Sequence, residues 1–274
     1  MTIDLSIVGV VRFSVLTSTY YSERFPTLEE KAAHLFSPQR MELRLRVFER
    51  LCLRSLRRQT DQGFHLVVVT AEDMPVPYLE RLHDLVEGAD NITLLPVGAS
   101  NHYGTLRRAY DLVPSHDASH RLLFRLDDDD AVDLDYIARN RRLAMGLIPL
   151  QGEQTPFILA NNRGIYLRRT EGPDGPQDEI FDACEKAPLS VGAALVAPVG
   201  YGPNPYRFNH RKFAQHWNTF SDISVPGFVR TIHGDNKSSP AQMGITHKQS
   251  DAEIATDLKR HFDLTPQQLK DVLP

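Results

Sequence analysis

The chain carries four consecutive aspartates, Asp127 to Asp130, directly after an apolar run that begins at Leu122. Four adjacent carboxylates repel one another, so this segment needs a positive counter-ion. Carboxylates at the end of a strand commonly hold Mg²⁺ or Mn²⁺ and leave open positions for phosphate oxygens. Alternate loop residues tend to point the same way, which makes Asp127 and Asp129 the natural pair and Asp130 a third candidate.

A second interpretation of the aspartates stays open, and a third is disfavoured. A solvated acidic turn that caps the following helix fits the same residues, because carboxylates favour helix N-termini. A calcium loop of the EF-hand type fits poorly, since Ala131 follows the aspartates and no glycine stands where that loop must turn.

Three arginines and a histidine are further candidates for contact with a charged ligand. Arg44 lies on the apolar face of a predicted helix, so its charge needs a partner in a neighbouring element or in a phosphate. Arg125 either pairs with an aspartate or points to the opposite face of the sheet. Arg107 opens a predicted helix and is a candidate for phosphate or ribose contact, whereas His233 beside Gly234 fits a turn histidine bound by backbone.

The bulk composition sets limits on the class of protein. A chain of 274 residues can bury a sizeable core, and its formal charge of −4 does not favour nucleic-acid binding. No apolar stretch approaches the roughly 20 residues of a membrane-spanning helix, and the first residues lack the features of a signal peptide. The two cysteines, Cys52 and Cys184, form no disulfide framework and suit a reducing cytoplasm.

The first part of the chain alternates between strand-like and helix-like segments, which favours a mostly parallel sheet covered on both faces. Residues 20–39 form a polar segment that we expect to act as a lid or acceptor loop. Asp133 is the expected N-cap of the helix after the aspartates. The expected strands cover residues 10–16, 65–69 and 92–96 and the run into Asp127, and the expected helices cover 41–58, 78–86, 104–112 and 134–145.

From Pro149 onward the pattern becomes richer in short strands and turns. We expect residues 1–240 to form one domain, with a nucleotide-sugar half over 1–148 and an acceptor half over 149–240. Residues 241–274 should form a tail with a polar linker and a short helix over 266–272. In the acceptor half the expected strands are 156–160, 164–168, 189–197 and 225–233, with a turn over 171–176 and a helix over 207–217.

The order of these elements resembles the GT-A glycosyltransferases, particularly family-2-like enzymes, and more narrowly the bacterial putative rhamnosyltransferase family. Three stretches carry the resemblance, in the same order as in those enzymes. They are Arg54-Ser-Leu-Arg-Arg-Gln-Thr60 followed by the strand over 64–69, Phe124-Arg-Leu-Asp-Asp-Asp-Asp130, and Arg230-Thr-Ile-His-Gly-Asp-Asn-Lys-Ser238.

The resemblance implies a role for each matching residue. Asp127 and Asp129 fall on the Asp-x-Asp positions that hold Mn²⁺ or Mg²⁺ and the donor's sugar diphosphate, with Asp130 and His233 as further metal candidates. On the donor side the resemblance implies contact of Glu72 or Asp73 with the base or ribose and of Asp127 with the sugar diphosphate; Asp128 and Arg107, the latter from its place at the start of a helix, are further donor-binding candidates. No Glu-Asp pair stands between Val191 and His233, so Asp222 becomes the default general base.

The implied reaction is metal-dependent transfer of a sugar from a nucleotide-diphosphate sugar to a hydroxyl, with inversion at the anomeric carbon. The acceptor would be a saccharide or a lipid-linked molecule met at the cytoplasmic face of the membrane. One alternative is a nucleotidyltransferase that makes sugar nucleotides. It ranks second because such enzymes usually carry a glycine-rich phosphate loop just after the first strand, and residues 13–21, which occupy this place, contain no glycine. The other is a catalytically degenerate sugar- or nucleotide-binding module.

Overall fold

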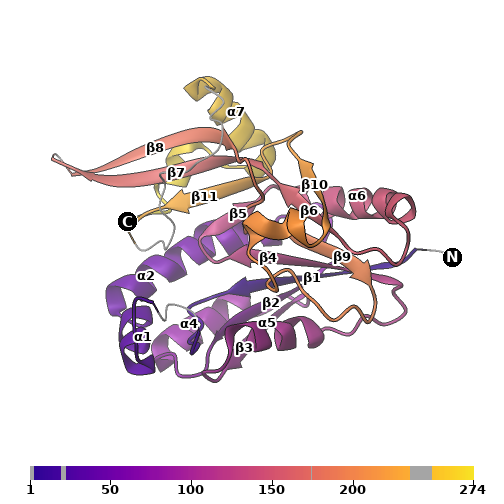
Figure 1. The fold of residues 1–274 in the computed structure, drawn as a ribbon. Helices are drawn as coiled ribbons and strands as arrows, with labels where there is room; N and C mark the ends of the chain where they lie inside the picture. Colours follow the sequence, from indigo (N-terminus) through magenta and orange to yellow (C-terminus); the bar gives the residue numbers. More distant parts are fainter. Residues whose placement is uncertain (1–2, 20–22, 174, 235–248) are drawn as a thin grey trace.

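Two β-sheets flanked by helices make up the protein (Figure 1). The computed structural model describes residues 3–19, 23–173, 175–234 and 249–274. A seven-stranded sheet has the order β10-β6-β9-β4-β1-β2-β3, and a four-stranded sheet has the order β5-β11-β7-β8. This architecture confirms the predicted α/β class, with a mostly parallel sheet between helices and a smaller β-rich part.

The seven-stranded sheet draws on both predicted halves of the chain. All of its strands run in one direction except β9, which is antiparallel to β4 and β6. The predicted strand over 189–197 begins too early, and the strand β10 was not predicted. The strands are β1 (Leu5–Arg12), β2 (His65–Ala71), β3 (Ile92–Val97), β4 (His120–Asp127), β6 (Phe157–Asn161), β9 (Ala194–Pro198) and β10 (Asn218–Asp222).

Strand β1 lies several residues earlier than the predicted strand over 10–16. It begins at Leu5 and ends at Arg12, directly opposite Asp127 of β4. Ser14 has a φ of 48°, in the left-handed region, and this conformation cannot continue a strand. Because β1 ends at Arg12, this side chain lies at the carboxyl end of the sheet, beside the aspartates.

Helices cover both faces of the seven-stranded sheet. The predicted helix over 41–58 is a continuous α–π–α segment, and α5 packs on the opposite sheet face through Leu106 and Tyr110. α1 lies inside the predicted lid or acceptor loop, so that prediction is wrong for this part; Thr27 caps α1 with a capping box. These helices are α1 (Leu28–Leu35), α2 (Pro38–Val47), η1 (Phe48–Leu53), α3 (Arg54–Arg57), α4 (Val76–Val86), α5 (His102–Asp111) and α6 (Tyr136–Gln151).

The predicted N-cap of α6 is wrong. Asp135 is the N-cap residue, without a side-chain cap bond, and Asp133 instead accepts a hydrogen bond from the Asp135 N–H at 3.1 Å. Both carboxylate oxygens of Asp133 also accept hydrogen bonds from Arg139 at 2.6 Å. The Asp133 carboxylate therefore binds the N–H of the N-cap residue and the side chain of Arg139, instead of capping the helix itself.

The four-stranded sheet joins the aspartate segment to later parts of the chain. The β7–β8 hairpin pairs Gly172 with Gly175, inside the predicted turn, but the strand β8 was not predicted. η2, a 3₁₀ helix over His210–Gln215, occupies the middle of the helix predicted over 207–217. The strands are β5 (Asp130–Val132), β7 (Arg163–Gly172), β8 (Gly175–Cys184) and β11 (Phe228–Ile232).

The C-terminal segment packs on the four-stranded sheet. α7 (Asp251–Phe262) and α8 (Pro266–Lys270) bury an apolar stripe against the face formed by β7 and β11. The predicted polar linker is therefore wrong from Asp251 onward, whereas the short terminal helix is confirmed. Residues 241–248 of the predicted tail, and 235–238 of the third family-like stretch, lie outside the described residues.

Candidate active site

The four aspartates lie where the two sheets meet, since β4 ends at Asp127 and β5 begins at Asp130. Side chains alternate between the two faces of a strand. Leu123 packs with α5, so Arg125 and Asp127 lie on the α5 face of the sheet. On β1, Val8 and Val10 pack in the same cluster, which places Arg12 on this face as well.

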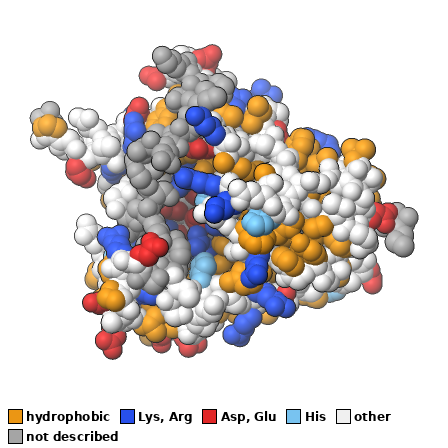
Figure 2. All heavy atoms as spheres, viewed as in Figure 1, with side chains coloured by type: hydrophobic (Ala, Val, Ile, Leu, Met, Phe, Trp, Pro, Cys, Tyr) orange, Lys and Arg blue, Asp and Glu red, His pale blue; other side chains and the backbone are white. Residues whose placement is uncertain are grey.

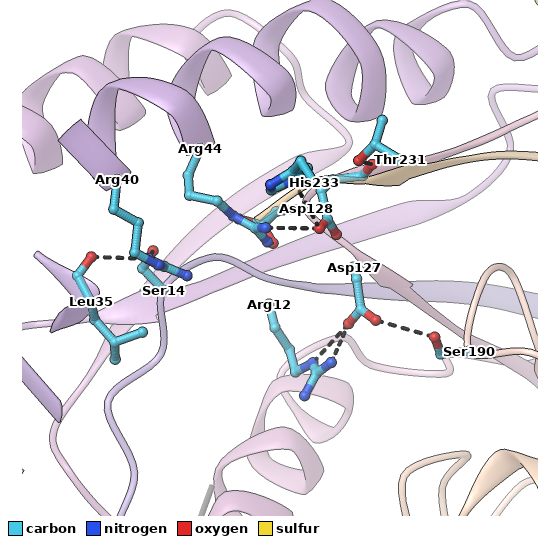
Figure 3. Close-up of polar contacts among 11 residues, drawn as sticks. Arg12, Ser14, Leu35, Arg40, Arg44, Asp127, Asp128, Ser190, Thr231 and His233 are labelled. Atoms are coloured by element: carbon cyan, nitrogen blue, oxygen red, sulfur yellow. Dashed lines mark hydrogen bonds and ion pairs between the residues drawn. The ribbon is translucent and has the colours of Figure 1, made fainter. Parts of the chain in front are cut away.

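Asp127 is held by two side chains on the α5 face (Figure 3). The Arg12 guanidinium donates to Oδ1 through Nε at 3.1 Å and through Nη2, and the Ser190 hydroxyl donates to Oδ2 at 3.2 Å. Burial alone would raise the pKa of Asp127. The positive charges of Arg12, Arg125 and Arg230 outweigh burial and hold this pKa well below its usual range. Asp127 is therefore a carboxylate anion, and its side chain keeps 24% of its surface exposed.

Asp128 and Asp129 share one arginine on the opposite side of the segment. Arg44 donates to Asp128 through Nε at 2.9 Å and through Nη2, and to Asp129 Oδ2 through Nη1 at 2.8 Å (Figure 3). This contact supplies the partner that the sequence required for a charge on the apolar face of α2. Burial raises the pKa of Asp128, Arg44 lowers it, and the charge of Asp129 raises it further; the net change is upward.

Asp130 lies in a row of polar side chains along the inner face of the four-stranded sheet. Arg230 on β11 pairs with Asp130 on one side and Tyr166 on the other. Burial raises the pKa of Asp130 well above its usual value, as does the neighbouring Asp129, while Arg230 opposes the rise. The Tyr166 hydroxyl donates to Glu185 Oε1 at 2.5 Å, which adds a further carboxylate to this row of polar side chains.

The sequence did not identify Glu185 as a candidate. It lies at the end of β8, where its backbone N–H donates to the Asn162 carbonyl at 2.7 Å. Five residues later the same loop reaches Asp127 through Ser190, so it crosses the carboxyl edge of the large sheet. Glu185 precedes the interval that begins at Val191, in which the base was expected, and the hairpin that positions it was only partly predicted.

His233 lies beside the aspartates, as predicted. Its Nε2 atom is 3.7 Å from Asp129 Oδ2. Two residues earlier on the chain, the Thr231 hydroxyl donates to the Asp129 carbonyl at 2.8 Å. His233 also borders a cavity of about 1010 Å³ between α2 and the β7–β8 hairpin, whose walls include Arg46 and Arg169. The structure thus brings His233 to Asp129, and its role with a metal stays a prediction.

The predicted metal ligands do not form a cation site as they are arranged. Within residues 3–19, 23–173, 175–234 and 249–274, no three His, Cys, Asp or Glu side chains group as metal ligands. Arg12 and Ser190 occupy the oxygens of Asp127, while Asp129 turns to Arg44 on the other side. A Mn²⁺ or Mg²⁺ ion would have to displace at least one guanidinium, so these residues do not fit a bound metal in their present arrangement.

The donor-side predictions have different outcomes. Glu72 and Asp73 follow β2 and are exposed at the same carboxyl edge, roughly 10 Å from β4 because β1 lies between them. Arg107 lies elsewhere: its side chain is 60% exposed, its Nε is 3.6 Å from Asp111, and it borders a cavity of about 140 Å³. Asp128 has a side chain only 3% exposed and bound to Arg44, so it does not face open space.

Asp222 is not brought to the other carboxylates. β9 and β6 separate β10 from β4, which places Asp222 roughly 14 Å from Asp127 across the sheet. Asp222 Oδ2 lies 3.1 Å from Arg139 Nε, and Arg139 belongs to α6, on the sheet face opposite Asp127. The sequence could not show this separation, because it depends on the order of strands in the sheet.

Two histidines near Asp127 are neutral. Burial, with the charges of Arg12 and Arg125, lowers the pKa of His102 to about 3, and its Nε2 lies 3.3 Å from Arg12 Nη1. Burial and Arg125 likewise lower the pKa of His210 to about 3. Basic side chains (Lys or Arg) and histidines gather near the centre of the face drawn in Figure 2. The positive charge around Asp127 therefore comes from arginines.

A carboxylate set among arginines at the carboxyl end of a mostly parallel sheet is suited to a ligand that carries phosphate. Comparison with known families places the chain among glycosyltransferases. Residues 6–245 match the family described as "putative rhamnosyl transferase", and the chain belongs to this family.

Solved structures with some likeness include two nucleotide complexes. S. aureus TarS 1-349 with UDP-GlcNAc has 12% identity and a TM-score of 0.44, over 98% of this chain and 70% of that one. The same protein with UDP has 11% identity and a TM-score of 0.40, over 96% and 73%. A "putative glucose-1-phosphate thymidylyltransferase" from Bacillus anthracis has 10% identity and a TM-score of 0.38, over 81% and 89%. Likeness at this level carries no conclusion about activity.

Among curated proteins no match was found. None of the helices in the described ranges combines the length and apolar character needed to cross a membrane.

Proposed function

We propose that the chain transfers a sugar from a nucleotide-diphosphate sugar to an acceptor hydroxyl, with inversion at the anomeric carbon. The observation that carries this proposal is the ionised Asp127 at the carboxyl end of the parallel strands, bound by Arg12 and within reach of the charge of Arg125. Ligands of open α/β sheets bind at this edge, and guanidinium groups match phosphate oxygens. Membership of the rhamnosyl transferase family supports the class of reaction.

The reaction needs stabilisation of a leaving group. The bond between the anomeric carbon and the diphosphate oxygen breaks, and its electron pair leaves with the nucleoside diphosphate. Positive charge that is already in place stabilises the oxygen on which negative charge develops. Arg12 and Arg125 have their guanidinium groups beside Asp127 for this purpose, and Asp127 holds Arg12 in position.

The reaction also needs a base for the acceptor hydroxyl, whose oxygen forms the new bond to the anomeric carbon. We assign this role to Glu185, because its partner Tyr166 shares an inner sheet face with Arg230, and Arg230 acts electrostatically on Asp127. The carboxylate would take the hydroxyl proton as the new bond forms. Asp222 stays the sequence-based alternative, although it faces α6.

The release of nucleoside diphosphate tests the proposal. The protein is incubated with UDP-, GDP- and dTDP-sugars, with and without saccharide acceptors, and the diphosphate released is measured. Asp127→Asn should lower turnover about 100-fold, the scale of losing one group that supports transition-state charge. The control Asp111→Asn, at the exposed end of α5, should retain turnover.

Three results would contradict the proposal. The first is unchanged turnover in Asp127→Asn. The second is consumption of a nucleoside triphosphate with a sugar 1-phosphate, which would support the nucleotidyltransferase alternative. The third is donor binding without any product, which would support the degenerate binding module.

The base assignment has its own comparison. Glu185→Gln should lower transfer to an acceptor about 100-fold or more, as expected for loss of general-base catalysis. Asp222→Asn should lower the transfer rate much less, because Asp222 contacts Arg139 and Ser224 rather than the polar side chains on the inner face of the four-stranded sheet. The opposite order of effects would return the role to Asp222.

A further inference from the structure

We infer that Arg12 and Arg125 hold the donor's diphosphate directly, and that donor binding needs no divalent cation. This inference rests on the proposed function. It departs from the metal predicted from the sequence, which becomes the opposing outcome of the test below.

The two carboxylates of the Asp-x-Asp pattern do not converge. Asp127 is held on the α5 side by Arg12 and Ser190, whereas Asp129 turns toward Arg44 of α2 (Figure 3). The same guanidinium binds Asp128 through two nitrogens, which fixes the connecting residue. A cation that bridges Asp127 and Asp129 would require this arrangement to break.

Arginines of the chain already provide the counter-charge for the aspartates. Arg12 pairs with Asp127, Arg44 with Asp128 and Asp129, and Arg230 lies beside Asp130. Arginine stays protonated in proteins, so this charge is permanent. The electrostatic need that the sequence presented is therefore met within the chain.

Arg125 keeps a buried hydrogen-bond donor for a ligand. Arg125 is 8% exposed, and its Nε has no hydrogen-bond partner among the residues that the structure describes. Its guanidinium carbon lies 4.1 Å from the centroid of the Tyr206 ring, and its Nη1 donates to the Pro205 carbonyl at 3.3 Å. A buried donor of this kind is costly unless a ligand or water accepts from it.

The positions of the two arginines suit a diphosphate. Arg12 stands directly opposite Asp127 on the neighbouring parallel strand, and Arg125 precedes Asp127 by two residues on the same face. Both guanidinium groups lie over the Tyr206 ring, with their carbons 5.3 Å and 4.1 Å from its centroid, and His102 lies beside Arg12. Planar guanidinium groups bind phosphate oxygens through hydrogen bonds, and Arg125 keeps its Nε donor for such a contact.

Calorimetric titration with UDP, GDP and dTDP tests the inference, in EDTA and then in Mn²⁺. We expect at least one nucleotide to bind in EDTA with a dissociation constant within about threefold of its value in Mn²⁺. Arg125→Met should weaken binding in EDTA at least about tenfold, the scale of a lost hydrogen bond to a charged group. The control Arg57→Met, whose exposed guanidinium donates to the Leu85 carbonyl, should bind as the unmodified chain does.

The outcomes separate the inference from the proposed function. Binding that appears only with Mn²⁺, together with donor turnover in Mn²⁺, overturns the inference and leaves the glycosyl transfer in place. Absence of nucleotide binding and of donor turnover in both buffers overturns both. The titration of the unmodified chain decides the question even where a variant fails to fold.

Discussion

Arg44 offers the sharpest test of how the aspartate segment is held together. Its guanidinium binds both Asp128 and Asp129, and all three side chains are less than a tenth exposed. Arg44→Met keeps much of the volume but leaves two buried carboxylates without this cation. Breaking a buried ion pair by removing one partner costs on the order of 4 kcal/mol. This is a large share of the roughly 5–15 kcal/mol that stabilises a folded protein.

The cost should depend on pH through Asp128. Because burial raises the pKa of Asp128, the folded protein binds a proton where the unfolded chain has already lost it. That contribution to stability is fully present below the ordinary carboxyl pKa of about 4 and is lost as the pH rises through the raised value. Arg44 lowers the pKa of Asp128, so Arg44→Met raises it further and extends the loss to higher pH.

Urea denaturation at pH 5.5 and pH 8 measures both effects. The free energy of unfolding of Arg44→Met should fall by about 4 kcal/mol at pH 8 and by less at pH 5.5, with each unit of pKa change worth about 1.4 kcal/mol. The double variant Arg44→Met, Asp128→Asn should recover part of the loss at pH 8. Arg57→Met is the matched control on α3. A loss below about 1 kcal/mol at pH 8, or one that does not change with pH, would refute the reasoning.

Two further predictions concern the core. Gly9→Ala should lower the free energy of unfolding by about 2 kcal/mol in urea denaturation, because an added Cβ meets the Phe124 ring; a change below about 0.5 kcal/mol would show that the ring moves freely. Cys52 is fully buried, and its pKa is raised by burial and by the aspartates. Its thiol should therefore react with a disulfide reagent only as fast as the protein unfolds, and later than the thiol of the partly exposed Cys184. Fast reaction of both thiols in the native protein would contradict this.

Much of the large sheet could be predicted because its signals are local. The apolar run of β2 and the periodicity of the helix from Met41 identify elements without knowledge of their neighbours. The apolar run before Asp127 likewise predicted a strand that ends in carboxylates. The need of Arg44 for a partner followed from its place on an apolar face, although the sequence could not say that the partner was the aspartate pair itself.

The remaining features depend on distant contacts. β8 carries Asp178, Glu179 and Asp182 among its residues and is a strand through its pairing with β7, and α7 is defined by a stripe that packs on β11 and β7. The position of Asp222 depends on the insertion of β9 and β6 beside β4, which no local pattern records. Glu185 becomes a candidate only when the hairpin brings Tyr166 beside Arg230.

A crystal structure with a bound nucleoside diphosphate tests the central claim most directly. We expect the diphosphate against Arg12 and Arg125, next to Asp127, with the base directed toward Glu72 and Asp73 at the end of β2. A nucleotide bound elsewhere, such as the cavity between α2 and the β7–β8 hairpin, would contradict it.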